Sequence, residues 1–157
     1  MSGRDPQISF RPLAADDELF LVHLYARTHG RQLAQASDDP QMQLLLKMQC
    51  ESQQRQYAAC ENADLQIVLL NGEPVGRWYV QRKPEEFHII DIALLPGSLP
   101  GLGRTIVRGF LLEAADRNVC VHAHVEKANR AWLLWKRMGF RIVGDTGMYH
   151  EILWCPD

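Results

Sequence analysis

The stretch Ile90-Asp91-Ile92-Ala93-Leu94-Leu95-Pro96-Gly97-Ser98-Leu99-Pro100-Gly101-Leu102-Gly103-Arg104-Thr105 decides the fold of this chain. It begins with an apolar run that lacks alternation, which is typical of a strand buried on both faces. It ends in a glycine-rich turn, after which Ile106, Phe110 and Leu111 recur at the spacing of one helix face. We therefore predict a strand over 88–95, a turn over 101–105 and then a helix.

The turn has the chemistry of an anion site. Glycines let the backbone approach a ligand closely, and the first N–H groups of a helix are unpaired and carry partial positive charge. Together these features suit a phosphate or pyrophosphate, and Arg104 adds a cation. Neither G-x-x-x-x-G-K-[ST] nor G-x-G-x-x-G is present, which excludes the P-loop and the dinucleotide fingerprint. A helix start that simply needs glycines is the alternative interpretation.

The flanking sequence extends this core in both directions. Upstream we predict a strand over 8–12, helices ending near Thr28 and Ala58, and strands over 65–70 and 73–80 joined by Asn71-Gly72, a strong hairpin signal. Downstream we predict a strand over 119–125, a helix over 129–138 that Gly139 ends, and hairpin strands over 140–143 and 148–154. The expected class is α/β with a mixed sheet, in which the segment 88–125 forms a parallel βαβ unit.

The bulk composition limits the partners and the compartment. With 157 residues and a net charge of −2, the chain is expected to form one domain over residues 1–157. The absence of Lys/Arg runs gives no reason to expect nucleic acid, and there is no apolar stretch of membrane-spanning length or secretory signal. We therefore expect no membrane partner and a cytoplasmic location. In a reducing compartment the four cysteines, at positions 50, 60, 120 and 155, are expected to be free, and their spacing predicts no metal site.

Three signatures in residues 89–154 resemble the GCN5-related N-acetyltransferase (GNAT) superfamily. The first is Ile90-Asp91-Ile92-Ala93-Leu94-Leu95-Pro96, which is similar to the central strand of the family. The second is the turn Gly101-Leu102-Gly103 before an apolar helix. The third and most specific is Asn129-Arg130-Ala131-Trp132-Leu133-Leu134-Trp135-Lys136-Arg137-Met138-Gly139-Phe140, which is similar to N-x-x-A-x-x-L-Y-x-x-x-G-F. The resemblance implies a GNAT-like sheet of about six or seven strands with about four flanking helices.

What the resemblance implies is binding of acetyl-CoA. The pyrophosphate would rest on the turn, the pantetheine would run along the strand, and the N–H of Leu94 would face the thioester carbonyl as an oxyanion donor. Asn129 would hold the pantetheine arm, although an Asn there is also a good helix N-cap. The predicted cofactor-binding residues are Ile92, Leu94, Leu95, Gly101, Leu102, Gly103, Arg104, Thr105 and Asn129.

Two features depart from the family pattern. Ser98 stands where the family usually has Arg or Gln. Leu99-Pro100 then sits where a polar donor is usual, and Pro100 has no N–H to donate. Trp135 stands where the family usually has the Tyr that is credited with protonating the departing thiolate. Its indole N–H is a donor, but it has no acidic proton for that role. Trp135 is therefore a catalytic candidate that hydrogen-bonds the sulfur, or a residue that packs against the cofactor.

A general base is needed to deprotonate an incoming ammonium group. The candidates are Asp91 and Glu126, with the histidines of the strands behind them and Tyr149 as a replacement acid. For Asp91 the alternative is a structural pair with a partner such as Arg77. The acceptor is expected to be framed by residues 28–57 and 82–87. Three aromatic residues are candidates to line the acceptor site, or alternatively to pack on the face of the sheet: Trp78, Tyr79 and Phe87.

The function implied is an acetyl-CoA-dependent N-acetyltransferase that acts on a primary amine of a small molecule or a protein. One alternative is a catalytically impaired module that binds acyl-CoA weakly or binds a partner protein. Another is an acyltransferase with a longer acyl chain or a different acceptor atom. A homodimer through the C-terminal strands is an option by analogy with the family.

Overall fold

The computed structural model describes residues 5–29, 39–127, 129 and 131–157. Its strands form one seven-stranded sheet in the order β1-β2-β3-β4-β5-β7-β6. The chain divides into two compact units, the first comprising Met1–Tyr79 with Asp91–Ser98 and the second Val80–Ile90 with Leu99–Asp157. The predicted α/β class is confirmed, because antiparallel and parallel pairs coexist and the described residues form four α-helices. The expectation of one domain over 1–157 stays a prediction.

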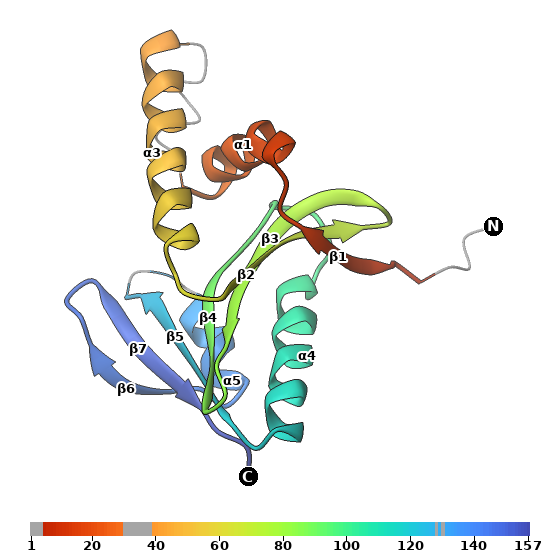
Figure 1. The fold of residues 1–157 in the computed structure, drawn as a ribbon, viewed down its shortest axis with the longest axis vertical. Helices are drawn as coiled ribbons and strands as arrows, with labels where there is room; N and C mark the ends of the chain where they lie inside the picture. Colours follow the sequence, from red (N-terminus) through yellow and green to blue (C-terminus); the bar gives the residue numbers. More distant parts are fainter. Residues whose placement is uncertain (1–4, 30–38, 128, 130) are drawn as a thin grey trace. The chain divides into compact units, whose positions relative to one another are not determined.

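The first unit carries the N-terminal helices and strands. Its elements are β1 (Ile8–Pro12), a short 3-10 turn (Ala15–Asp17), α1 (Glu18–His29), α3 (Pro40–Ala58), β2 (Ala63–Leu70) and portions of β3 (Glu73–Arg82) and β4 (Glu86–Leu94). Helices α1 and α3 contact one another (Figure 1). Leu21, Cys50 and Ile67 form a buried cluster, and burying a side chain of the size of Leu21 or Ile67 contributes about 1.5–3 kcal/mol.

Two local sequence signals in this unit, a helix start and a hairpin turn, are confirmed. The Asp39 side chain accepts the Gln41 N–H and caps α3, with Pro40 at the first helical position. Asn71 and Gly72 both have positive φ values, 52° and 84°, as a tight hairpin turn between β2 and β3 requires.

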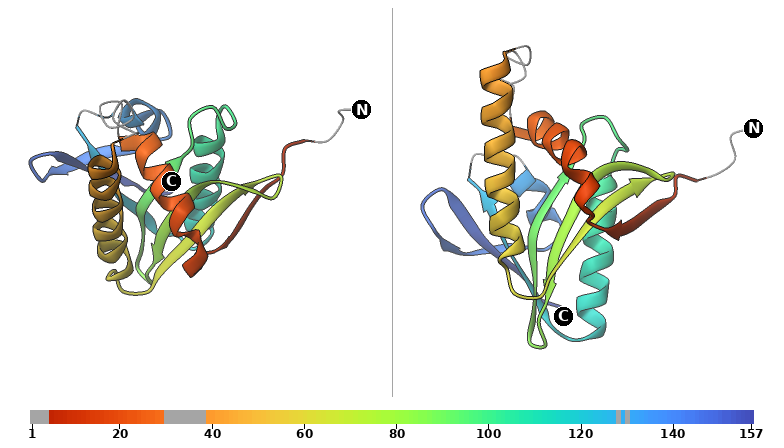
Figure 2. Two further views of the ribbon diagram at one scale, coloured as in Figure 1. Left: turned by 90° about the horizontal axis from the view of Figure 1, so that it is seen from above. Right: turned by 45° about the horizontal axis from the view of Figure 1, so that its top comes forward.

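The second unit is built around α4 and the C-terminal strands. Its elements are α4 (Leu102–Asp116), β5 (Cys120–Glu126), α5 (Ala131–Arg137), β6 (Arg141–Asp145) and β7 (Tyr149–Trp154), with the remaining parts of β3 and β4. Strand β5 pairs parallel to β4 and antiparallel to β7, and β6 and β7 form a hairpin (Figure 2). One face of α4 is buried, and Phe110 stacks on Phe87 of β4 with ring centroids 5.1 Å apart.

The prediction that the strand over 88–95 is buried on both faces is wrong. Within β4 only Phe87 and Ile89 are buried, and the others, including Asp91 and Leu94, are half-buried. One face of the strand packs on α4 through Phe87, whereas His88 lies on the other face with polar neighbours.

The prediction of free cysteines is wrong for one pair. Cys120 and Cys155 form a disulfide with their Cα atoms 4.2 Å apart, whereas Cys50 and Cys60 are free. Strands β5 and β7 pair antiparallel with Val121 opposite Trp154, and this register brings the adjoining cysteines together. Among the helices of the described residues, none is long and apolar enough to cross a membrane.

Candidate functional site

The glycine turn leads directly into α4. Gly101 caps the helix with φ +78°, a left-handed conformation that favours glycine, and a β-carbon built there would meet no atom within 4 Å. The Leu102 N–H donates to the Leu99 carbonyl and the Thr105 N–H to the Gly101 carbonyl. We predicted that residues 101–105 bind the pyrophosphate. Among them, the N–H groups of Gly103 and Arg104 lie in the first turn of α4, where no carbonyl of the helix is placed to accept them.

The end of β4 is set by a close approach to β3. A β-carbon on Gly76 would lie 2.4 Å from the Ala93 carbonyl oxygen and 2.5 Å from Cδ2 of Leu94. The Leu95 N–H donates to the Val75 carbonyl over 2.8 Å. Successive N–H groups of a strand point to opposite edges, so the Leu94 N–H is directed away from β3. Gly76 was missed by the sequence reasoning, although a glycine inside a strand is itself a signal of close backbone approach.

A buried polar network joins α3 to β3 and β4 in the first unit. The Arg77 guanidinium is completely buried, and its Nε donates to Oδ2 of Asp91 over 2.6 Å. Its Nη1 and Nη2 donate to the side-chain oxygens of Gln54 and Gln53 at 3.2 and 3.0 Å. Gln54 in turn donates to the Tyr79 hydroxyl. The pairing of Asp91 with Arg77, one of the two alternatives for this carboxylate, is therefore confirmed.

Aromatic rings complete the surroundings of Arg77. Its guanidinium carbon lies 5.2 Å from the ring centre of Tyr57 and 5.6 Å from that of Tyr79. Burial is the largest influence on the pKa of Arg77 and lowers it, but Asp91 and the two phenols together raise that pKa above its usual value. Burial, followed by the charge of Asp91, raises the pKa of Tyr57 well above that of a free phenol. The network therefore holds a permanent cation beside a carboxylate and two protonated phenols.

In the second unit Asn129 and Trp135 have clear structural roles. The Asn129 side-chain oxygen accepts the Ala131 N–H over 2.9 Å at the start of α5. Trp135 is buried and packs edge-on against Phe140, with ring centroids 5.3 Å apart. The capping alternative for Asn129 is confirmed, and the ligand contacts of both residues stay predictions.

The β5–β7 register brings together two candidates for proton transfer. Glu126, the last residue of β5, lies opposite Tyr149, the first of β7, and both are exposed. Residues directly opposite in an antiparallel pair share a face of the sheet. A carboxylate and a phenol are therefore neighbours at this end of the second unit.

Three histidines also share one face of the second unit. His88 lies opposite His122 in the β4–β5 register, and the ring centroids are 5.0 Å apart. His124 lies 5.4 Å from His122 on the same strand, while Glu86 contacts His88 and Glu151 contacts His124. Burial first, then the charges of His88 and His124, lowers the pKa of His122. These surroundings therefore favour the uncharged form of His122.

The aromatic candidates for the acceptor wall are buried. Trp78 is 5% and Phe87 1% exposed, which supports the packing alternative for both. Tyr79 is also buried, but its hydroxyl belongs to the Arg77 network. Residues 28–57 were predicted to frame the acceptor, and residues 30–38 of this segment lie outside the described residues. The rest of the segment contributes Gln53, Gln54 and Tyr57 to the Arg77 network.

No family model matches the chain, and no curated protein sequence matches it. Solved structures do match. The PaiA N-acetyltransferase of Thermoplasma acidophilum in complex with coenzyme A has a TM-score of 0.69 over 95% of this chain and 99% of its own, at 10% identity. An acetyltransferase from Thermus thermophilus has a TM-score of 0.68 over 95% and 97%, at 17% identity. A GNAT family acetyltransferase from Elizabethkingia anophelis with acetyl-CoA bound has a TM-score of 0.58 over 94% and 97%, at 16% identity. The chain therefore has the GNAT fold that its sequence predicted.

Proposed function

We propose that this protein is an acetyl-CoA-dependent N-acetyltransferase that acts on a primary amine. The observation that carries the proposal is the left-handed Gly101 at the head of α4, with open space where a side chain would stand. It occurs in a chain whose fold is that of acetyltransferases, two of which are described with coenzyme A or acetyl-CoA bound. Fold alone does not imply activity, so the argument rests on the residues of the site.

The residues at the turn fit a pyrophosphate. The N–H groups of Gly103 and Arg104 lie at the positive end of the α4 dipole, and the Arg104 side chain is exposed and cationic. Leu102 and Thr105 contribute differently, because their N–H groups already bond carbonyl oxygens and fix the shape of the turn. In this proposal Gly101 keeps the approach open, and Gly103 and Arg104 bind the anion.

At the end of β4 the Leu94 N–H would act as the oxyanion donor, with Ile92 and Leu95 flanking it on the strand. Acetyl-CoA supplies the acetyl group as a thioester. The amine nitrogen forms the new C–N bond, the C–S bond breaks, and coenzyme A leaves as a thiol. A fixed N–H at the developing oxyanion lowers the barrier more than a mobile solvent donor does. Gly76 supports this role because its missing side chain allows β3 to approach Leu94.

The amine must also lose its proton. Asp91 is the candidate base of the first unit. Arg77 donates to it, and the side-chain oxygens of Gln53 and Gln54 accept from Arg77 in turn. Glu126 is the candidate of the second unit, with Tyr149 opposite it as a candidate acid. Trp135 has an N–H donor but is packed against Phe140, which favours a supporting role for this residue.

Calorimetry and thermal shift with acetyl-CoA test the proposal. With a Kd near 10 μM, about 1 mM acetyl-CoA is expected to stabilise the protein by about 2.7 kcal/mol. A panel of primary amines is then assayed by thiol release, with a protein-only blank because Cys60 is a partly exposed free thiol. Absence of binding contradicts the proposal. Binding without turnover on any amine favours the non-catalytic acyl-CoA module.

A further inference from the structure

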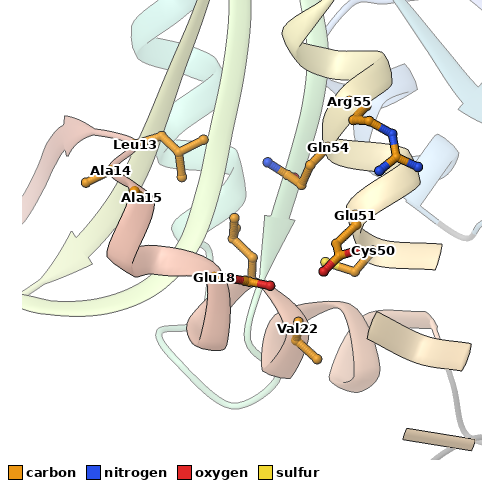
Figure 3. Close-up of a pocket in the computed structure, with 10 residues that line it drawn as sticks. Leu13, Ala14, Ala15, Glu18, Val22, Cys50, Glu51, Gln54 and Arg55 are labelled. Carbon is orange, nitrogen blue, oxygen red and sulfur yellow. The ribbon is translucent and has the colours of Figure 1, made fainter. Parts of the chain in front are cut away.

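The first unit contains a pocket with a volume of about 290 Å³ between the start of α1 and the C-terminal half of α3 (Figure 3). Its apolar lining includes Leu21, Val22 and Cys50, and Leu21 and Cys50 belong to the buried cluster of the unit. The volume is close to the lower end of the range typical for small-molecule sites. The pocket can therefore accept a short apolar body.

The wall that precedes α1 is held in a defined shape. Both carboxylate oxygens of Asp17 accept from the Arg11 guanidinium, at 2.6 and 2.8 Å. Oδ2 of Asp17 also accepts the Ala14 N–H over 2.8 Å, and Asp17 itself is buried. Ala14 lines the pocket, so this ion pair fixes the pocket wall without presenting its charges to a ligand.

Four polar side chains line the pocket: two carboxylates, one amide and one guanidinium, from Glu18, Glu51, Gln54 and Arg55. Glu18 on α1 and Glu51 on α3 lie on facing sides of the opening (Figure 3). Burial raises the pKa of the Cys50 thiol most, the Arg77 cation lowers it, and Glu51 and Glu18 raise it further, so charges of both signs act on this lining residue. Of the nearby cations, Arg55 lines the pocket from an exposed position, and Lys47 pairs with Glu18 at 3.7 Å between exposed side chains. Exposed ion pairs of that kind are weak and exchange readily.

The pocket is linked to the Asp91 network through one residue. Gln54 lines the pocket, and its side-chain oxygen accepts from Arg77, which in turn binds Asp91. All three residues belong to the first unit. A molecule seated against Gln54 therefore contacts the same network that holds the candidate base.

We propose that this pocket binds a small aliphatic primary amine, whose apolar body lies on Leu21, Val22 and Cys50 and whose ammonium group lies between Glu18 and Glu51. Charge complementarity carries the choice of ligand, because two of the three charged side chains of the lining are carboxylates, which repel a carboxylate or phosphate ligand, and the third, Arg55, is exposed. The proposal rests on the proposed function, since it names the class of acceptor.

The test measures amine binding without acetyl-CoA, so that it is independent of turnover. Hexylamine is titrated into the full chain by calorimetry, with hexan-1-ol and hexanoate as matched uncharged and anionic probes. We expect hexylamine to bind at least tenfold more tightly than either. Glu18→Gln and Glu51→Gln are each expected to weaken hexylamine about threefold to tenfold, as loss of a charge-assisted hydrogen bond does. Arg55→Gln is expected to tighten it, because that variant removes a competing cation.

The control variant is Glu73→Gln, an exposed carboxylate at the start of β3 that does not line the pocket. It should leave hexylamine affinity unchanged. Equal binding of the three probes, or hexylamine affinity that neither glutamate variant alters, overturns the proposal. Acetyl-CoA affinity is measured in the same variants and is expected to stay at the wild-type value. Failure of acetyl-CoA to bind the wild type contradicts the proposed function instead, whatever the amine result.

Discussion

The Nε of Arg77 donates to Oδ2 of Asp91 over 2.6 Å, and no part of the Arg77 side chain is exposed. Asp91→Asn keeps the shape of this pair but leaves a buried cation without its counter-ion. Breaking one partner of a buried ion pair costs about 3–5 kcal/mol, and we expect the lower end because the Asp91 side chain is 24% exposed. Chemical denaturation measures the loss. The double variant Arg77→Met/Asp91→Leu should recover part of the lost free energy of unfolding. If the double variant is destabilised as much as Asp91→Asn, this account is contradicted.

Gly76→Ala is expected to weaken acetyl-CoA binding and to destabilise the fold. The new methyl would overlap the Ala93 carbonyl and the Leu94 side chain, and overpacking of this kind costs about 1–3 kcal/mol. Denaturation and calorimetry check the two effects. The matched control is Gly109→Ala, a helical position in α4 with no atom within 4 Å of the added carbon, which should gain about 0.5–1 kcal/mol.

Reduction of the Cys120–Cys155 bridge is expected to destabilise the protein. The two cysteines are separated by 35 positions, and closing a loop of that length contributes about 3–4 kcal/mol in the chain-entropy account. Unfolding with and without a thiol reductant measures the difference. Cys155→Ser should show the lower stability and no response to reductant. If reductant lowers the stability of the wild type no more than that of Cys155→Ser, the bridge does not form in solution.

Acidification should weaken the fold through His122. Its lowered pKa means that the unfolded chain binds the proton more readily, so this contribution is fully present above the unfolded pKa of about 6.5 and is lost below it. The facing groups are His88, His124, Glu86 and Glu151. The lowered pKa of Glu86 adds a second loss at more acidic pH, below its unfolded pKa of about 4.5. His122→Gln should flatten the dependence below about pH 6.5, whereas His23→Gln, on the exposed side of α1, should not.

Arg104→Ala is expected to weaken acetyl-CoA about threefold to tenfold, because it removes a cation from the first turn of α4 where we place the pyrophosphate. The matched control is Arg108→Ala, one helical turn further on and also exposed. Calorimetry at two salt concentrations compares them. Equal effects of the two substitutions would show that Arg104 acts only through the general charge of the helix.

The sequence predicted the elements of the fold well, because their signals are local. Asn71-Gly72, Pro40 and Gly139 mark ends that the backbone confirms, with Gly139 at φ +106° after α5. The disulfide was missed because it depends on the register of β5 against β7, which no local pattern specifies. The degree of burial of β4 was misjudged because an apolar run does not reveal which neighbours cover each face.

The candidate site was predicted less completely. Asp91 and its partner Arg77 were both identified, but the amides that complete the network were not. Gln53 and Gln54 lie in a glutamine-rich helix that reads as a solvent-exposed surface, and their contacts with Arg77 span more than twenty positions of sequence. Helical periodicity indicates which face is apolar, but it does not indicate which polar residue meets a buried charge.

Gln54 lines the pocket and also bonds Arg77 and Tyr79, so its side chain joins the docking of α3 to the pocket where we propose that the amine binds. A substitution there changes both properties together, whereas Glu18 and Glu51 can vary singly at the mouth of the pocket. We expect relatives that diverge in acceptor preference to differ first at positions 18 and 51. Positions 54, 77 and 79 should covary as a set. A directed-evolution library that changes acceptor choice should therefore leave Gln54 intact.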